Sequence, residues 1–208
     1  MKPLIAGIVL AAGSGGRMGE VKQLLDYGGK PVLQWVIDAA CDSMLDSVFV
    51  VLGYEKERII KDIDFSKAGI IENSLFEHGQ STSLKAGVQA ISQEYEAAMF
   101  LLGDQPLVDS NVINKIRETY LESRASILIP TFKGKRGNPV LMDRSVFPRL
   151  MKLSGDTGGR ALFQEYNDSL KFIEVDCSGI LFDLDTKEDY QELLQKRDPE
   201  DTDVMLDS

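Results

Sequence analysis

Residues 10–22 read LAAGSGGRMGEVK and directly follow an apolar run at residues 4–9 that has the composition of a buried strand. Glycine lacks a Cβ, so the four glycines of this stretch let the backbone turn sharply and approach a ligand closely. Successive N–H groups in such a turn form an anion site. Arg17 and Lys22 add two cations, and the guanidinium group of the former fits phosphate oxygens in pairs. The stretch therefore predicts a triphosphate-binding loop, with an ordinary turn as the alternative.

Two well-known phosphate-binding motifs do not fit the spacing of this stretch. The Walker pattern requires Gly-Lys-Ser/Thr after its glycines, whereas Gly16 is followed here by Arg17 and Met18. The dinucleotide fingerprint requires three glycines at fixed offsets and an immediate helix, and residues 24–29 do not read as a helix opening. Both motifs are therefore excluded.

Composition bounds the class of protein. The chain has 208 residues, 43% of them hydrophobic, which predicts one domain over residues 1–197. Half of the net charge of −10 comes from residues 198–208, expected to be a disordered acidic tail. The mildly acidic remainder disfavours nucleic-acid binding, and no apolar run or leader predicts a membrane partner. Cys41 and Cys177 form no CxxC motif, which fits a cytoplasmic protein without a disulfide framework.

Apolar runs alternate with amphipathic segments along the first part of the chain. Strands are expected at residues 47–52, 69–72, 97–102 and 126–130, and helices at residues 32–40, 54–62, 81–92 and 112–121. This alternation predicts an α/β fold with a mostly parallel sheet, in which ligands bind outside the carboxyl ends of the strands. Gly13, Gly53, Asn73 and Gly103 follow strand ends, so we expect them to line one crevice.

The second half of the chain is expected to add further strands and helices to the same domain. Residues 133–136 predict a turn between strands at 127–129 and 139–141, and residues 143–151 a short helix. After a loop at 152–159, a helix is expected from residue 160. Strands at 170–175 and 180–184 and a closing helix at 186–196 complete the chain.

Three carboxylates are candidates for binding a metal ion. Asp104 follows a buried strand, where Mg²⁺ prefers a single carboxylate completed by water and phosphates, although a turn cap is the alternative. Asp183 and Asp185 alternate with apolar residues, so both would leave one face of a strand. Asp185 also stands at a helix start with Glu188 three residues on, so capping and metal binding both remain open for it.

A cationic loop facing carboxylates suits phosphoryl or nucleotidyl transfer, in which the protein mainly positions and neutralises charge. A Ser/His/Asp hydrolase does not fit, because His78 is the only histidine and no GxSxG motif occurs.

Six motifs occur in an order that is far more specific than any one of them: LAAGSGGRMGEVKQLL (10–25), NSLFEHGQSTSLKAGV (73–88), GDQP (103–106), RGNPV (136–140), SGDTGGR (154–160) and DLDTKEDY (183–190). On these motifs, residues 5–195 resemble the molybdenum cofactor cytidylyltransferase family, a molybdopterin nucleotidyltransferase branch of the NTP transferase superfamily. The resemblance implies a Rossmann-like three-layer α/β sandwich of the nucleotide-diphospho-sugar transferase type, mostly parallel with one antiparallel strand. It also implies transfer of CMP from CTP, or of another nucleotide from its NTP, to molybdopterin with release of pyrophosphate.

The same resemblance implies roles for individual residues. Arg17, Lys22 and Asp104 would be catalytic, and Mg²⁺ would bind Asp104 and Asp185, with Asp183 as the alternative second ligand. The nucleotide would be bound by Leu10, Ala11, Ala12, Gly13, Gly15, Gly16, Arg17, Lys22, Gly79, Gln80, Ser81, Ser83 and Asp104. The acceptor would be bound by Asn138, Pro139, Asp156 and Arg160.

Two positions bear on the choice of substrates. Ala12 stands where the guanylyl branch carries glycine, which favours CTP over GTP, and Asn138 stands where relatives often carry histidine, which leaves the acceptor open. Ser81 and Ser83 have a plain helix cap as the alternative. The rival functions are nucleotidyl transfer to a sugar or alditol phosphate and a non-catalytic accessory role toward a molybdenum hydroxylase. A molybdenum hydroxylase could also be the partner that receives the product of the enzyme.

Overall fold

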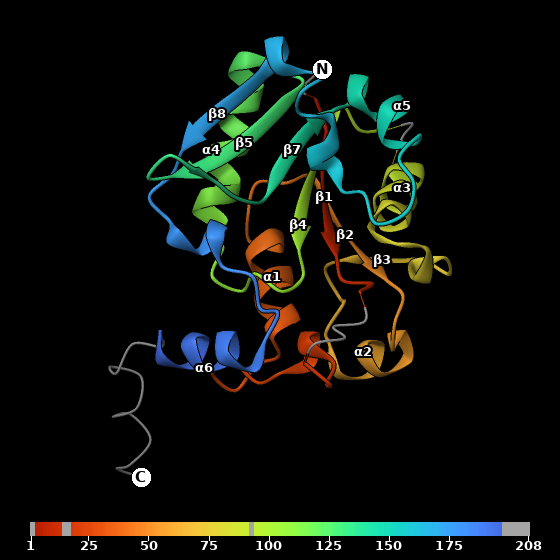
Figure 1. Cartoon of the computed structure of the whole chain (residues 1–208), viewed down its shortest axis with the longest axis vertical. Coiled ribbons are helices and arrows are strands. Elements are labelled where there is room, and N and C mark those ends of the chain that lie inside the picture. Colours follow the sequence, from red (N-terminus) through yellow and green to blue (C-terminus); the bar gives the residue numbers. More distant parts are fainter. Residues whose placement is uncertain (1–2, 14–17, 92–93, 197–208) are drawn as a thin grey trace.

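The computed structural model describes residues 3–13, 18–91 and 94–196, in which a twisted sheet carries helices on both faces (Figure 1). Across the sheet the strand order is β3-β2-β1-β4-β7-β5, and β5 also pairs with β6 and β8. The first four strands run parallel to one another. They span Ile5–Leu10 (β1), Ser47–Leu52 (β2), Gly69–Glu72 (β3) and Ala97–Leu102 (β4).

The central sheet contains a reversed strand, as the resemblance implied. β7 pairs antiparallel with β4 on one side and with β5 on the other, and β8 runs parallel to β5. β6 is a two-residue antiparallel partner at the end of β5, so the hairpin expected around residues 133–136 is present. These strands span Ile127–Phe132 (β5), Lys135–Arg136 (β6), Val140–Asp143 (β7) and Leu170–Glu174 (β8).

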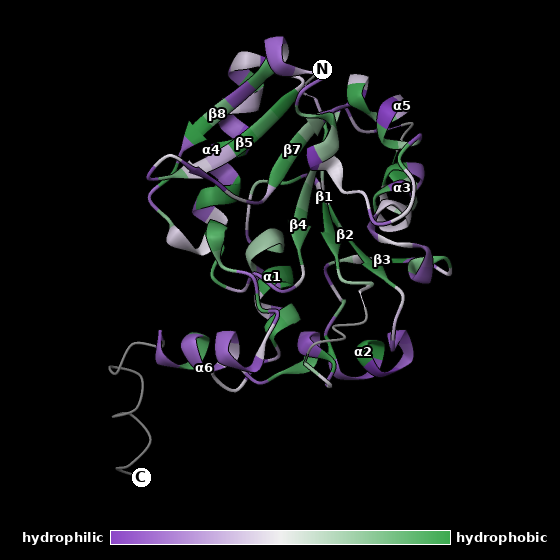
Figure 2. Cartoon of the chain, viewed as in Figure 1, coloured by the Kyte–Doolittle hydropathy of each residue, from purple (hydrophilic) through white to green (hydrophobic). Residues whose placement is uncertain are grey.

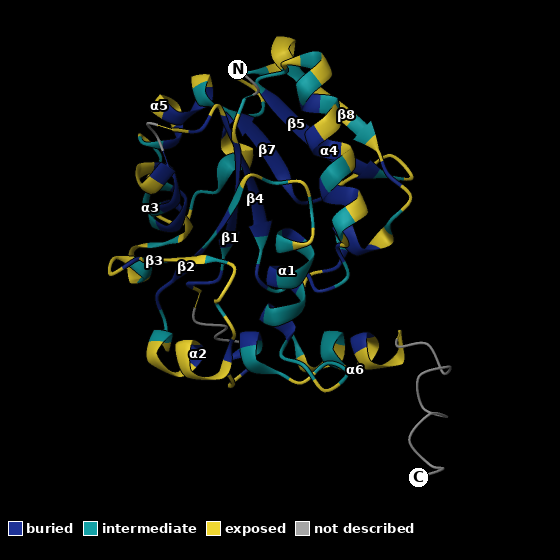
Figure 3. Cartoon of the chain, turned by 180° about the vertical axis from the view of Figure 1, so that it is seen from behind, coloured by how far each residue is buried: buried dark blue, intermediate teal, exposed yellow. Residues whose placement is uncertain are grey.

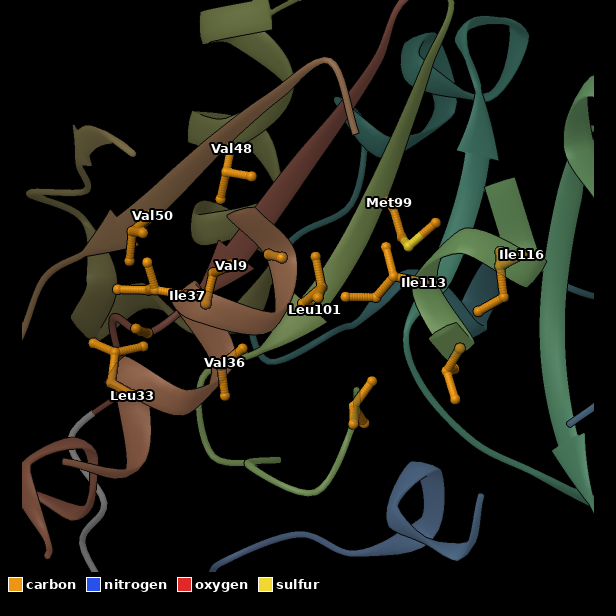
Figure 4. Close-up of a cluster of buried hydrophobic side chains, with 14 of the residues drawn as sticks. Val9, Leu33, Val36, Ile37, Val48, Val50, Met99, Leu101, Ile113 and Ile116 are labelled. Atoms are coloured by element: carbon orange, nitrogen blue, oxygen red, sulfur yellow. The ribbon is translucent and has the colours of Figure 1, made fainter. Parts of the chain in front are cut away.

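Helices α1 and α4 cover one face of the sheet, and α3 and α5 cover the other. Figure 4 shows Leu33 of α1 and Ile113 of α4 among the buried side chains packed against β1, β2 and β4. A second cluster joins Leu84 of α3 and Leu150 of α5 to the opposite face. The three-layer architecture is therefore confirmed. The helices span Val32–Cys41 (α1), Lys56–Asp62 (α2), Gln80–Ile91 (α3), Ser110–Ser123 (α4), Phe147–Leu150 (α5) and Lys187–Gln195 (α6).

The sequence explains these elements locally. β1 and β4 are nearly continuous apolar runs because helices cover both of their faces. Figures 2 and 3 show the central strands as hydrophobic and buried, in contrast to the polar, exposed surfaces of α2 and α6. α4 begins at Ser110, two residues before the predicted start at 112, and Asp109 caps it by accepting a hydrogen bond from Val112 N at 2.9 Å.

Two predicted elements are wrong. Ser178–Leu181 forms a 3-10 turn, and residues 182–185 belong to no strand. The alternation of Phe182 and Leu184 is satisfied by packing against Val32 and Leu193, which needs no strand partner. The helix expected from residue 160 is only the 3-10 turn Gly159–Leu162.

Some predictions fall outside the described residues. These are the roles of Gly15, Gly16 and Arg17 and the acidic tail at 198–208, and the domain boundary at residue 197 stays a prediction. Among the residues that are described, no helix combines the length and apolar character needed to cross a membrane.

Candidate active site

Two cavities open beyond the carboxyl ends of β1 and β4, where ligands bind in parallel sheets. The larger has a volume of about 860 Å³ and the smaller about 510 Å³. Both are lined by Leu10, Gln80, Leu102, Asp104, Asp156 and Asp185. The cavities are therefore adjoining compartments that meet at carboxylates from three distant segments of the chain.

The larger cavity gathers most of the described residues that were predicted to bind the nucleotide. Its lining includes Leu10, Ala12, Gly13, Lys22, Gly79, Gln80, Ser83 and Asp104, together with Gln23, Tyr54, Phe76 and Glu77. Two predicted residues lie elsewhere. Ala11 is buried in the core, and Ser81 is buried against the neighbouring loop, where its N–H and its hydroxyl both donate to Gly155 O.

The smaller cavity gathers three of the four residues predicted to bind the acceptor. Asn138, Asp156 and Arg160 line it. Pro139 does not, because it faces a small interior gap that it shares with Val36. The lining of this cavity also includes Asp183, together with Asp104 and Asp185.

Lys22 links the amino-terminal loop to two of the carboxylates. Its Nζ lies 2.5 Å from Asp104 Oδ2 and 2.9 Å from Asp185 Oδ1. The side chains of Lys22 and Asp104 are mostly buried, whereas that of Asp185 is half exposed. Burial lowers the pKa of Lys22, but the charge of Asp104 and the hydrogen bonds to both carboxylates outweigh burial and raise its pKa above the ordinary 10.5. Lys22 is therefore held as a cation where the two cavities meet.

The second carboxylate oxygen of Asp104 has no hydrogen-bond partner among the described residues. This oxygen is the buried Oδ1, and the alternative of a turn cap finds no support. An ionised oxygen in that position is unfavourable unless a cation or donor reaches it. Within the described ranges no cluster of three or more His, Cys, Asp or Glu side chains is arranged for a metal ion. Asp104, through its buried Oδ1, and Asp185, which shares Lys22 with it, suit a hard divalent cation that takes one or two carboxylates and completes its shell with phosphates and water.

Asp185 does not cap the closing helix, contrary to the alternative left open by the sequence. Asp189 N donates to Thr186 Oγ1 at 3.1 Å, and the Asp189 carboxylate accepts from Thr186 N at 2.7 Å. The capping box is therefore formed one residue later than the spacing of Asp185 and Glu188 indicated. Because Thr186 provides the helix cap, the Asp185 carboxylate instead forms an ion pair with Lys22.

Asp183 occupies a different position from Asp185. Its Oδ1 accepts a hydrogen bond of 2.7 Å from Nε2 of the buried Gln105. Burial and the nearby charge of Asp104 raise the pKa of Asp183, although the Gln105 bond opposes them. Asp183 lines only the smaller cavity, so Asp185 is the carboxylate that shares Lys22 with Asp104.

Gln23 holds the start of the glycine-rich loop, and nothing in the sequence pattern marks it. It is buried, and its Nε2 donates to Ala11 O and Gly13 O, each at 3.2 Å. A Cβ at Gly13 would meet no atom of the described residues within 4 Å, and Gly13 lines the larger cavity. Gln23 therefore holds the backbone of residues 11–13, and a ligand in the larger cavity can approach Gly13.

The wall between the cavities rests on two loops in backbone contact. Gly79 has φ +98°, and a Cβ there would lie 2.4 Å from the carbonyl carbon of Gly155. Only glycine fits such a position. In the next residues, Asp156 Oδ1 accepts from Gln80 N at the start of α3, so Asp156 rather than a serine meets this N–H group.

The expectation for the four strand-end residues is met only in part. Gly13 and Gly103 line the larger cavity. Gly53 is packed beneath an aromatic side chain that an added Cβ would meet at 2.7 Å. Asn73 is buried and donates to Ser83 Oγ at 3.0 Å. Gly53 and Asn73 therefore support the cavity wall from behind.

The chain is similar to several known proteins. The family described as MobA-like NTP transferase domain matches residues 7–170. The purine catabolism protein PucB of Bacillus subtilis is 30% identical over 197 residues, covering 90% of this chain and 95% of PucB. The molybdenum cofactor cytidylyltransferase of Escherichia coli is 28% identical over 185 residues, covering 88% of this chain and 92% of the enzyme. The crystal structure of Rv0371c from Mycobacterium tuberculosis in complex with manganese matches at TM-score 0.80 and 26% identity, covering 93% of this chain and 99% of that one.

Proposed function

Because the chain belongs to the family of MobA-like NTP transferase domains and is thus a nucleotidyltransferase, we propose that it transfers CMP from CTP to the phosphate of a molybdopterin-type cofactor. The observation that carries this proposal is the contact of Lys22 with both Asp104 and Asp185 at the junction of two cavities. Two compartments with charged groups at their junction suit direct transfer between two substrates held in position.

In this proposal the triphosphate lies in the larger cavity and the acceptor in the smaller one. Lys22, joined by Arg17 from the glycine-rich loop, neutralises the charge that develops as pyrophosphate leaves. Asn138 and Arg160 orient the acceptor. An oxygen of the acceptor phosphate attacks the α-phosphorus, the α–β phosphoanhydride bond breaks and pyrophosphate departs. The protein supplies no nucleophile and forms no covalent intermediate.

Asp104 and Asp185 would hold a divalent cation, Mg²⁺ in our proposal, which would neutralise phosphate charge. The buried Oδ1 of Asp104, which receives no hydrogen bond from the described residues, supports this assignment. So does the manganese complex of the relative from Mycobacterium tuberculosis. The ion pair that Lys22 makes with both side chains keeps them together when no cation is bound.

Ala12 supports CTP as the nucleotide. It is 2% exposed and lines the larger cavity, so its methyl group fills space that a glycine would leave open. A narrower site favours a pyrimidine over a purine base. The resemblance to an enzyme named as a cytidylyltransferase points in the same direction.

The test combines binding with turnover. CTP with Mg²⁺ should raise the melting temperature more than GTP, ATP or UTP does, because a ligand selective for the native state stabilises it by mass action. With molybdopterin as acceptor, pyrophosphate release should fall at least about 100-fold in Asp104→Asn and in Arg17→Ala, a loss in the range caused by removing one group that stabilises the transition state. Asp176→Asn, an exposed carboxylate outside both cavities, is the matched control.

The other outcomes separate the rivals. Full turnover in either variant rejects the assigned roles. Pyrophosphate release with sugar or alditol phosphates but not with molybdopterin would show that the acceptor is such a phosphate and not molybdopterin. Nucleotide binding without any pyrophosphate release would favour an accessory role.

A further inference from the structure

A third cavity, of about 560 Å³, adjoins the smaller cavity of the active site. Both cavities share Arg160 and Phe163. The chain also passes directly from one to the other, since Gly137 lines the third cavity and Asn138 lines the smaller one. The third cavity is therefore a continuation of the compartment assigned to the acceptor.

The charge of this third cavity is opposite to that of the chain. Its lining contains two arginines and no carboxylate: Ile129, Arg136, Gly137, Arg160, Phe163, Gln164, Asn167, Leu170 and Phe172. The whole chain has 33 acidic and 23 basic residues. Among the ion pairs of the described residues, none involves Arg136 or Arg160. Two guanidinium groups thus line one open cavity, and Arg160 also lies close enough to Asp183 to act on its pKa.

The structure holds Arg136 in place from two sides. Its backbone pairs with Thr131 of β5, and its guanidinium lies 4.7 Å from the ring centroid of Phe172. The following Gly137 is locked, because a Cβ there would lie 2.3 Å from Ile180 O. Phe172 is 44% exposed, which is unusual for a large apolar ring and leaves its surface open toward the cavity side of β8. A guanidinium fixed in this way loses little freedom when it binds an anion.

We propose that this third cavity binds a second anionic group of the acceptor, remote from the phosphate that reacts. The inference rests on the proposed function and narrows the acceptor to a molecule with two anionic groups, one bound in the smaller cavity and one in the third cavity. Arg136 and Arg160 bind the remote group through charge-assisted hydrogen bonds, and Phe163 and Phe172 contact the apolar or planar part beside it. An acceptor with a single phosphate leaves Arg136 without a partner and binds more weakly.

The first experiment measures binding without turnover. Inorganic phosphate is titrated into the ¹⁵N-labelled full chain, and the side-chain Nε–Hε signals of Arg136 and Arg160 are followed by NMR. Both should move in a saturable manner. Arg136→Gln should weaken the response of Arg160 at least about five-fold, whereas Lys135→Gln should leave it unchanged. Lys135 is the matched control because adjacent residues of a strand point to opposite faces, and it does not line the cavity. Signals that do not move, or equal responses in both variants, would overturn the proposal.

The second experiment measures turnover with CTP, Mg²⁺ and molybdopterin. Arg136→Gln should raise the KM for the acceptor about ten-fold or more, while kcat and the KM for CTP stay unchanged, because charge-assisted hydrogen bonds are lost only in acceptor binding. Lys135→Gln should behave like the unsubstituted chain. An unchanged acceptor KM in Arg136→Gln overturns the proposal. If the unsubstituted chain turns over no acceptor, the proposed function fails, and the phosphate titration alone then decides whether the third cavity binds anions.

Discussion

Substituting Gly79 with alanine should separate the two loops that form the wall between the active-site cavities. A side chain at φ +98° and ψ 173° is strained by about 1–3 kcal/mol. Its Cβ would also lie 2.4 Å from backbone atoms of Gly155, so the loops must move apart. That movement breaks the two hydrogen bonds from Ser81 to Gly155 O and the one from Gln80 N to Asp156, each worth about 1 kcal/mol.

The summed loss is roughly 4–6 kcal/mol, which for a domain of this size lowers the melting temperature by roughly 10–20 °C. Differential scanning calorimetry and urea unfolding measure it. Gly134→Ala is the control, since Gly134 has φ +74° with no atom within 4 Å of an added Cβ, and should lose only about 1–2 kcal/mol. If Gly79→Ala loses no more stability than Gly134→Ala, the loops are not held by this contact and the reasoning fails.

Three further predictions follow from single contacts. Gly13→Ala should melt within about 2 °C of the unsubstituted chain, because its Cβ meets no atom of the described residues within 4 Å. It should nevertheless lose most of the stabilisation that CTP with Mg²⁺ gives in a thermal shift assay, and an unchanged CTP effect would show that no ligand approaches Gly13. Asp183→Asn should raise the free energy of unfolding at pH 7, because the raised pKa of Asp183 means that its ionised form destabilises the native state. This gain in stability should shrink as the pH falls through the raised pKa toward the ordinary value of 3.8. A gain that does not depend on pH would contradict this cause. Thr186→Ala should lower the free energy of unfolding by about 1 kcal/mol, because the α6 cap is lost. Lys187→Ala should not lower it, and equal effects of the two substitutions in urea unfolding would argue against the capping box.

Much of the fold could be predicted because its strands are marked locally. The expected bounds of the strands at 47–52, 69–72 and 97–102 match β2, β3 and β4. β2 and β4 are continuous apolar runs because helices cover both of their faces, so their limits are visible in the sequence, whereas β3 is a mostly exposed edge strand. Residues 180–184 form no strand, although apolar and acidic residues alternate there, because a segment outside the sheet can bury alternate side chains without a strand partner.

The candidate site divides in the same way. The sequence by itself determined the residue types: a glycine-rich loop with Lys22, a carboxylate at the end of β4 and a pair of aspartates near the closing helix. Only the tertiary structure decided that Lys22 contacts Asp104 and Asp185 and that Gln23 holds the backbone of Ala11 and Gly13. The physical reason is range, because strand and cap patterns depend on neighbours a few residues apart, whereas Lys22 and Asp185 meet across 163 positions through the packing of the whole sheet.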